Sequence, residues 1–67
     1  MKYNKENYVG KYIQLYPSDS YHKFGIIIGL DDLGWTIKIT KADEKATEKV
    51  NDVIFISHSK NFIFKFM

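Results

Sequence analysis

Histidines, serines and aspartates are the residues of this chain whose types could support nucleophilic catalysis. Such catalysis needs a serine, a histidine base and an orienting carboxylate that converge in space. Ser57 and His58 are adjacent, and Asp31 or Asp52 could supply the carboxylate. Because neighbouring strand residues point to opposite faces, Ser57 and His58 would not normally meet. We therefore expect that the chain is not an enzyme.

His22 and His58 are also the obvious candidates for metal binding. His22 has Asp19 three residues before it, and His58 stands between Ser57 and Ser59. Metal sites need three or four converging ligands, and the chain has no cysteine to supply thiolates. Lone histidines beside turns are ordinary loop residues. The sequence therefore predicts neither a metal site nor a cofactor.

Two adjacent carboxylates, Asp31 and Asp32, could coordinate a hard cation through oxygen. Calcium loops use a longer run of oxygen donors than this segment offers. The sequence Asp31-Asp32-Leu33-Gly34 is instead typical of a tight turn. An aspartate suits the first position of a type I turn, and Gly34 could adopt the left-handed conformation that follows. We interpret the segment as a turn between two strands.

Tyrosines are the residues that point most directly to binding. Tyr8, Tyr12 and Tyr16 fall on one side of a strand because strand side chains have period two, and Tyr21 follows in the next loop. Tyrosine provides a large contact area at small conformational cost. The predicted partner-binding residues are Tyr12, Tyr16, Tyr21, Lys11 and Lys23. The alternative is that the tyrosines fill one edge of the core.

The basic residues bear on the class of partner. All ten are lysines, and the formal net charge at pH 7 is +2. Arginine, which contacts guanine and phosphate bidentately, is absent. Lysines beside aromatic rings could still neutralise phosphate while the rings stack on bases. Four acidic residues between positions 31 and 44 weaken that case. We expect a protein partner, with RNA or single-stranded DNA as the alternative.

Five strand-like runs would position these side chains. They are short, rich in β-branched and aromatic residues, and bounded by turn residues, which predicts an all-β fold, a small five-stranded barrel. The runs are Tyr8–Tyr16, His22–Leu30, Trp35–Thr40, Val53–Ser57 and Phe62–Phe66.

Three of these runs allow more specific predictions. In His22–Leu30, Phe24, Ile26, Ile28 and Leu30 should share one face, and the glycines at 25 and 29 predict a bulge or a bend. In Trp35–Thr40, apolar and polar residues alternate, so one face should be buried. Val53–Ser57 is apolar on both faces, which favours a central strand with a buried Phe55.

The segment at 41–50 is charged and has no β-branched run before Val50. Thr40 followed by Asp43 resembles the start of a capping box, which favours a short helix. Like charges spaced four residues apart oppose a helix. One helical turn and a solvated loop therefore both remain open.

Glycines and alternation carry a resemblance to known small barrels. The segments Gly10–Leu15, Gly25–Gly29 and Gly34–Ile39 resemble the glycine-punctuated hairpin of KOW-type ribosomal and transcription barrels. The five runs, with a charged insertion before the fourth, also resemble a Src-homology-3-like barrel over about residues 8–57. The resemblance implies protein binding or RNA binding. The acidic loop and tryptophan pair of proline-peptide binders are not present, which argues against that activity.

Length and composition define the setting. The 67 residues form one domain, 1–67, and with no cysteine we expect the aromatic residues, 16% of the chain, to supply its core. Met1–Asn7 lacks the apolar segment of a secretory signal, and no apolar run approaches the roughly 20 residues that span a bilayer. We expect a cytoplasmic protein that engages no membrane. Abundant lysine, asparagine and isoleucine suggest an AT-rich coding sequence, and hence a phage or low-GC bacterial accessory protein that modulates a host enzyme.

Overall fold

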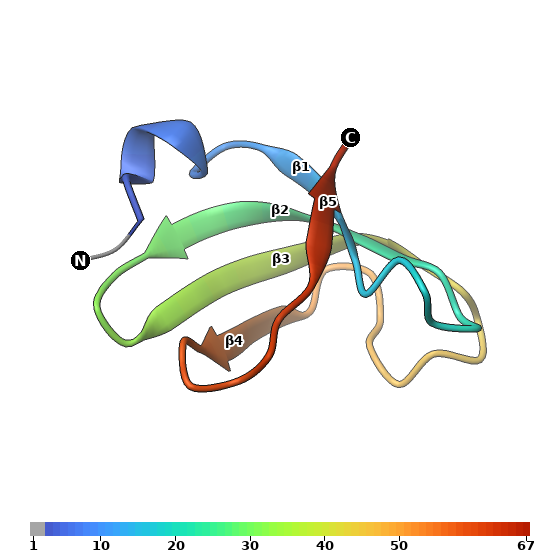
Figure 1. Cartoon of the computed structure of the whole chain (residues 1–67). Coiled ribbons are helices and arrows are strands. Elements are labelled where there is room, and N and C mark those ends of the chain that lie inside the picture. Colours follow the sequence, from blue (N-terminus) through green and yellow to red (C-terminus); the bar gives the residue numbers. More distant parts are fainter. Residues whose placement is uncertain (1–2) are drawn as a thin grey trace.

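Five antiparallel strands form one sheet in the computed structural model, which describes residues 3–67. Met1 and Lys2, part of the segment that lacks a signal pattern, lie outside these residues. The strands follow one short 3-10 turn, η1, and the strand order is β4-β3-β2-β1-β5 (Figure 1). The all-β five-stranded fold is confirmed. The elements are η1 Lys5–Asn7, β1 Tyr12–Leu15, β2 Lys23–Leu30, β3 Gly34–Ala42, β4 Val53–Ser57 and β5 Phe64–Phe66.

The core lies on one side of this sheet, which we call the inner face. On β3, Trp35, Ile37 and Ile39 are buried, as their alternation predicts, because strand side chains point alternately to the two faces. The buried residues of the other strands lie on the same face. They are Ile13, Leu15, Ile27, Leu30 and Ile56.

Aromatic rings close the inner face over Trp35. Phe64 of β5 lies 5.3 Å from Trp35, centroid to centroid, although β1 and β2 separate their strands in the sheet. In Figure 1, β5 accordingly crosses in front of β2 and β3, so the sheet curls over its own core. The other aromatic rings in contact with Trp35 belong to Tyr3, Tyr8, His58 and Phe62.

The first strand is shorter than the predicted run. It begins at Tyr12, because the chain first makes the 3-10 turn and then passes through Gly10, whose φ is +89°. It ends at Leu15, because Tyr16 takes a φ of +45°. These departures from extended geometry break the expected period of two. Tyr8 and Tyr16 therefore pack against the core, whereas Tyr12 points away from it.

The predicted irregularity in β2 is confirmed, and Phe24, Ile26 and Ile28 share a face as predicted, but the prediction is wrong for Leu30. The register with β3 shifts between Phe24 and Gly25 and again between Ile27 and Gly29. Ile27 and Leu30 are both buried, although strict alternation would put them on opposite faces. The second shift explains this, because an extra residue moves Leu30 onto the inner face.

The predicted central position of the strand Val53–Ser57 is wrong. β4 is an edge strand, paired with β3 alone, and the side chain of Phe55 is 55% exposed. An apolar residue on each face does not distinguish a central strand from an edge strand whose outward side chains stay in solvent. Ile56 is buried and Ile54 is half-buried on the inner face of β4.

The turn between β2 and β3 forms where the sequence predicts it. The Oδ1 atom of Asp31 accepts hydrogen bonds from the backbone N–H groups of Leu33 (2.9 Å) and Gly34 (3.1 Å). Gly34, however, does not take the left-handed conformation; the glycine with positive φ is Gly10. Glycine is needed at 34 for another reason, since a Cβ there would collide with the carbonyl oxygen of Ile56 on β4.

The Asp31 turn predicts a pH dependence of stability. The N–H groups of Leu33 and then Gly34 stabilise the carboxylate and hold the pKa of Asp31 below its ordinary value. Because the folded-state pKa is lowered, this contribution is present above the ordinary pKa and is lost as the pH falls through the folded value. Between about pH 5 and about pH 2, Asp31→Asn should therefore lose less of its free energy of unfolding than the parent chain.

Urea unfolding at several pH values measures this difference. Glu44→Gln, which removes an exposed carboxylate from the loop between β3 and β4, is the matched control. Equal acid sensitivity of Asp31→Asn and the parent would show that the turn carboxylate does not contribute.

The charged segment before β4 forms a loop, so the helical alternative does not hold. The loop is organised by its own side chains: Asp43 Oδ1 accepts from the N–H of Lys45, and Asp52 Oδ2 accepts from the N–H of Lys49. Ala46 is buried.

Candidate binding face on the outer side of the sheet

The side of the sheet opposite Trp35, which we call the outer face, exposes most of its side chains. The register pairs place Tyr12 of β1, Phe24 of β2 and Lys41 of β3 on this side. Tyr12 is 57% exposed. Other strand residues on the outer face include Gln14, Ile26, Ile28, Thr36, Lys38, Thr40, Val53, Phe55, Ser57 and Lys65.

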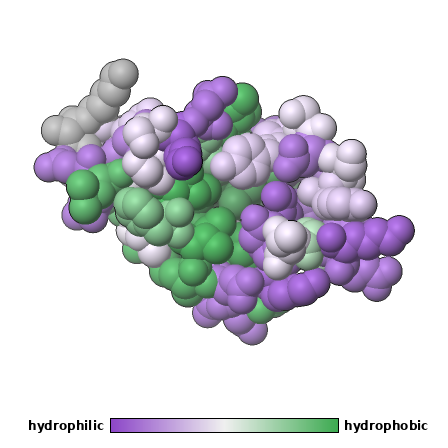
Figure 2. All heavy atoms as spheres, turned by 90° about the horizontal axis from the view of Figure 1, so that it is seen from below, coloured by the Kyte–Doolittle hydropathy of each residue, from purple (hydrophilic) through white to green (hydrophobic). Residues whose placement is uncertain are grey.

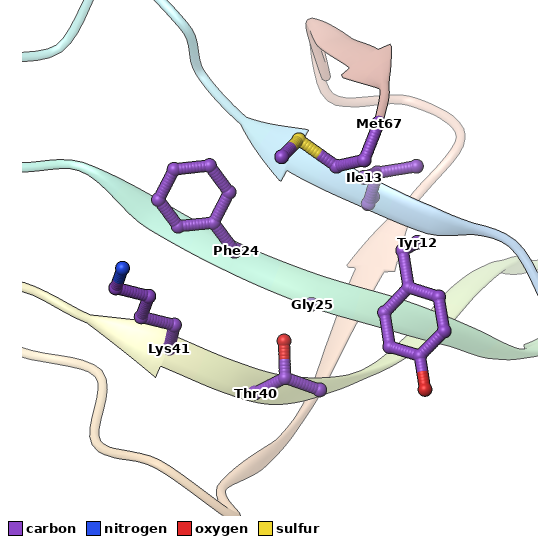
Figure 3. A pocket seen from close by; sticks show the side chains of 7 residues that line it. All are labelled: Tyr12, Ile13, Phe24, Gly25, Thr40, Lys41 and Met67. Atoms are coloured by element: carbon purple, nitrogen blue, oxygen red, sulfur yellow. The ribbon is translucent and has the colours of Figure 1, made fainter.

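A groove of about 460 Å³ crosses the outer face over β1, β2 and β3. Figure 3 shows Phe24 and Tyr12 on either side of the backbone at Gly25, where a Cβ would point away from the groove toward Ile37 on the inner face. Thr40, Lys41, Met67 and Ile13 of β1 also line the groove.

Two further hollows extend this groove at its ends. One shares Phe24 and Lys41 with it and continues to Gln14 and His22. The other shares Tyr12 and Met67 and continues to Lys11. Together they form one largely apolar channel, which we call the outer groove; Lys11 and Lys41 lie along it, and the carboxylate of Asp43 lies at the end near His22. Lys41 Nζ lies 5.9 Å from the centroid of the Phe24 ring, within the range of a cation–π contact.

Charge is segregated between strands and loops. The five strands contain four lysines and no aspartate or glutamate, so every acidic residue lies in a loop or turn. Lys38, Lys41 and Lys65 are on the outer face. The outer face is therefore both apolar and cationic, which favours a partner that presents apolar and acidic groups together.

The structure divides the predicted binding residues among three places. Tyr12 and Lys11 lie together at the outer groove. Tyr16 is half-buried with its ring 5.4 Å from that of Phe62, and Lys23 Nζ lies 5.3 Å from the Tyr16 ring centroid. Tyr21 is 45% exposed at a separate hollow on the loops. Whether these side chains contact a partner stays a prediction.

Lys23 is engaged within the chain. Its ammonium lies 3.5 Å from a carboxylate oxygen of Asp19 and 3.5 Å from one of Glu48. Burial alone would raise the pKa of Glu48, but hydrogen bonds from its own backbone N–H and from Thr47, together with Lys23, hold that pKa below its ordinary value. Lys23 therefore ties two loops together and is poorly placed to bind a ligand.

Phe24 and Lys41 are groove residues that the sequence did not identify. They face each other only because the register shifts beside Gly25. Gly25 was the available signal, since a glycine inside a strand often marks a bulge, and the register shifts between Phe24 and Gly25.

The potential catalytic groups do not form a triad. His58 Nε2 is hydrogen-bonded to the backbone oxygen of Asp31 at 2.7 Å, and the Ser57 hydroxyl is paired with that of Ser59 at 2.9 Å. His22 Nδ1 is bonded to the Gln14 side chain at 3.1 Å. Residues 3–67 contain no cluster of three or more histidine, aspartate or glutamate side chains placed to hold a metal ion.

Comparisons with protein-family models, with curated proteins and with solved structures found no match. In the described part of the chain, no helix has the length and apolar character that crossing a membrane requires. The class of partner must therefore be inferred from the outer face itself.

Proposed function

We propose that this chain is a non-enzymatic binding module that holds another protein in its outer groove. The observation that carries the proposal is the groove itself, which is lined by Tyr12, Phe24 and Met67 and bordered by Lys11 and Lys41. Exposed aromatic and methionine side chains are enriched at the centres of protein interfaces. Lysines at the border would select a partner segment that carries acidic side chains beside its apolar ones.

The wider assignment belongs to the same proposal. A Src-homology-3-like or KOW-type barrel would suit a binding role, because small barrels present their sheet faces and loops to partners. A cytoplasmic accessory protein from a phage or a low-GC bacterium, modulating a larger host enzyme, fits the size and the lysine-rich composition.

RNA or single-stranded DNA is the second candidate partner. The specific observation in its favour is that the strands carry lysines and no carboxylates, with Lys41 beside the ring of Phe24. Aromatic side chains next to cations are the usual platform for stacking bases and neutralising phosphates. Arginine is absent, so specific readout of a duplex is not expected.

Two substitutions in the outer groove should weaken partner binding. Tyr12→Ala removes an exposed ring, and Lys41→Glu reverses a border charge; each should lower the affinity for the partner about 5- to 30-fold, which corresponds to about 1–2 kcal/mol. The partner is first isolated by affinity capture from the native host, and the affinities are then measured by calorimetry with purified proteins.

Matched controls lie outside the outer groove. Tyr21→Ala removes an exposed tyrosine from a loop, and Lys45→Glu reverses a loop charge beside the same separate hollow. Both controls should bind like the parent, so for Tyr21 the proposal departs from the binding role expected from the sequence. If the controls weaken binding and the groove variants do not, the contact surface lies on the loops. If only nucleic acid is retained by the groove, the second candidate replaces the first.

A further inference from the structure

The free edge of β4 presents backbone groups that no described strand pairs. Hydrogen-bonded residue pairs alternate along an antiparallel ladder. The N–H of His58 donates to Leu33 (3.0 Å) and the N–H of Ile39 donates to Asp52 (2.8 Å), which fixes the phase of the ladder between β3 and β4. Ile54 and Ile56 therefore bond to β3. The residues that direct their N–H and C=O groups outward are Val53, Phe55 and Ser57, and of these groups the C=O of Ser57 already accepts from the N–H of Lys60 at 2.9 Å.

This edge lacks the features that usually protect an edge strand. In natural proteins, edge strands are protected against pairing with another chain by proline, by charged side chains, by bulges or by being very short. Val53–Ser57 contains no proline and no charge, and its register with β3 is unbroken. The opposite edge, β5, has only three residues, with Lys65 at its centre. Protection is therefore present at one edge of the sheet and absent at the other.

The side chains around this edge are also apolar. Val53 is 59% exposed and Phe55 is almost as exposed. Figure 2 looks from below Figure 1, the side toward which β4 lies, and shows hydrophobic side chains gathered there within a hydrophilic surround. A domain of this size buries little apolar surface by itself, so covering such an edge would add stability.

The sequence of β4 is complementary to itself. If a second copy pairs antiparallel with Phe55 opposite Phe55, Val53 lies opposite Ser57 of the second copy, so that all three outward-directed residues are used. Ile54 then faces Ile56 of the second copy on the inner face. At each end of the paired strands, Asp52 of one copy lies opposite His58 of the other copy, so no like charges are placed opposite each other. An interface of this kind has the two-fold symmetry of most homodimers.

We propose that a second copy of this chain docks on β4 and forms a ten-stranded sheet that continues across a two-fold axis at Phe55. The second molecule is a copy of the same chain because this register gives Val53, Phe55 and Ser57 of both strands partners at once, with the C=O of Ser57 accepting from Val53 as well as from Lys60. The outer groove lies over β1–β3, away from this edge, so both grooves of the dimer stay open.

Sedimentation equilibrium of the full chain tests the association, and a new cysteine tests the register. The chain has no cysteine, so Phe55→Cys introduces a single thiol. In the proposed register the two Cα atoms at position 55 are about 5.5 Å apart, which suits a disulfide. Val53→Cys is the matched control: the two thiols would be four residues out of register, about 13 Å apart. Mild oxidation should cross-link Phe55→Cys at least tenfold faster.

Opposite charges at the axis provide an independent test. Phe55→Lys and Phe55→Asp should each be monomeric, because like charges would oppose each other directly. An equimolar mixture should form a one-to-one heterodimer. Circular dichroism should show that each variant keeps the fold, because residue 55 is exposed. A parent chain that is monomeric at every concentration, equal cross-linking at 53 and 55, or variants that do not associate on mixing would overturn the proposal.

Discussion

Replacement of Trp35 by alanine is expected to lower the free energy of unfolding by about 3–5 kcal/mol. The side chain is 3% exposed and lies under the rings that close the inner face. The substitution loses the apolar surface that the indole ring buries. It also leaves a cavity, which the neighbouring rings of Tyr8, Phe62 and Phe64 would have to move to fill. Urea unfolding followed by far-ultraviolet circular dichroism measures the change.

Phe55→Ala is the matched aromatic control. Because Phe55 points to the outer face of an edge strand, its removal should cost less than about 1 kcal/mol in the monomer. If Trp35→Ala leaves the chain unfolded, Trp35→Phe should show a smaller loss in the same direction. Equal losses at 35 and 55 would contradict the position of the core.

Gly34→Ala should destabilise the chain by about 1–3 kcal/mol, through a collision and not through backbone strain. An added Cβ would meet the carbonyl oxygen of Ile56 and lie 2.8 Å from Cζ of Phe55. The Ile56 carbonyl belongs to the strand paired with β3 and cannot move without breaking the ladder. Thermal or urea unfolding of the two proteins gives the difference.

Two further variants distinguish a steric collision at position 34 from a requirement for a left-handed backbone there. Gly29→Ala places a Cβ 3.3 Å from Cβ of Thr36, a contact that a small shift relieves, so it should cost about 1 kcal/mol or less. Gly34→Asn would be tolerated if the position needed a left-handed backbone, since asparagine adopts it readily. We expect Gly34→Asn to be at least as damaging as Gly34→Ala. Tolerance of asparagine would restore the left-handed interpretation.

Local patterns predicted much of the fold because they depend on neighbouring residues. The alternation of Trp35, Ile37 and Ile39 gave the buried face of β3, and Asp31 gave the turn before it. The glycines of β2 marked its irregular register. Each of these features follows from side-chain period or turn chemistry, which a short segment already contains.

The errors arose where the fold depends on distant contacts. Whether β4 is central depends on what lies beyond it, and no pattern within Val53–Ser57 encodes that neighbour. The tyrosines were separated because Gly10 and Tyr16 leave extended geometry at the two ends of β1. One register shift was enough to move Leu30 to the opposite face from the one predicted.

The candidate site was predictable only in part. Tyr12 and Lys11 were identified because an amphipathic ring beside a cation suggests binding, and both lie at the outer groove. Phe24 and Lys41 were missed, since a cross-strand pair is visible only once the register is known. Sequence reasoning thus found Tyr12 on one side of the groove and missed Phe24 and Lys41 on the other.

The most direct test of the proposed function is site-specific photo-cross-linking in the native host. The photoreactive residue benzoylphenylalanine replaces Tyr12 in one chain and Tyr21 in another, and adducts are identified by mass spectrometry. We predict one discrete protein adduct from position 12, lost when Lys41→Glu is added, and no comparable adduct from position 21. An adduct from position 21 alone, or adducts at position 12 that consist only of nucleic acid, would contradict protein binding in the outer groove.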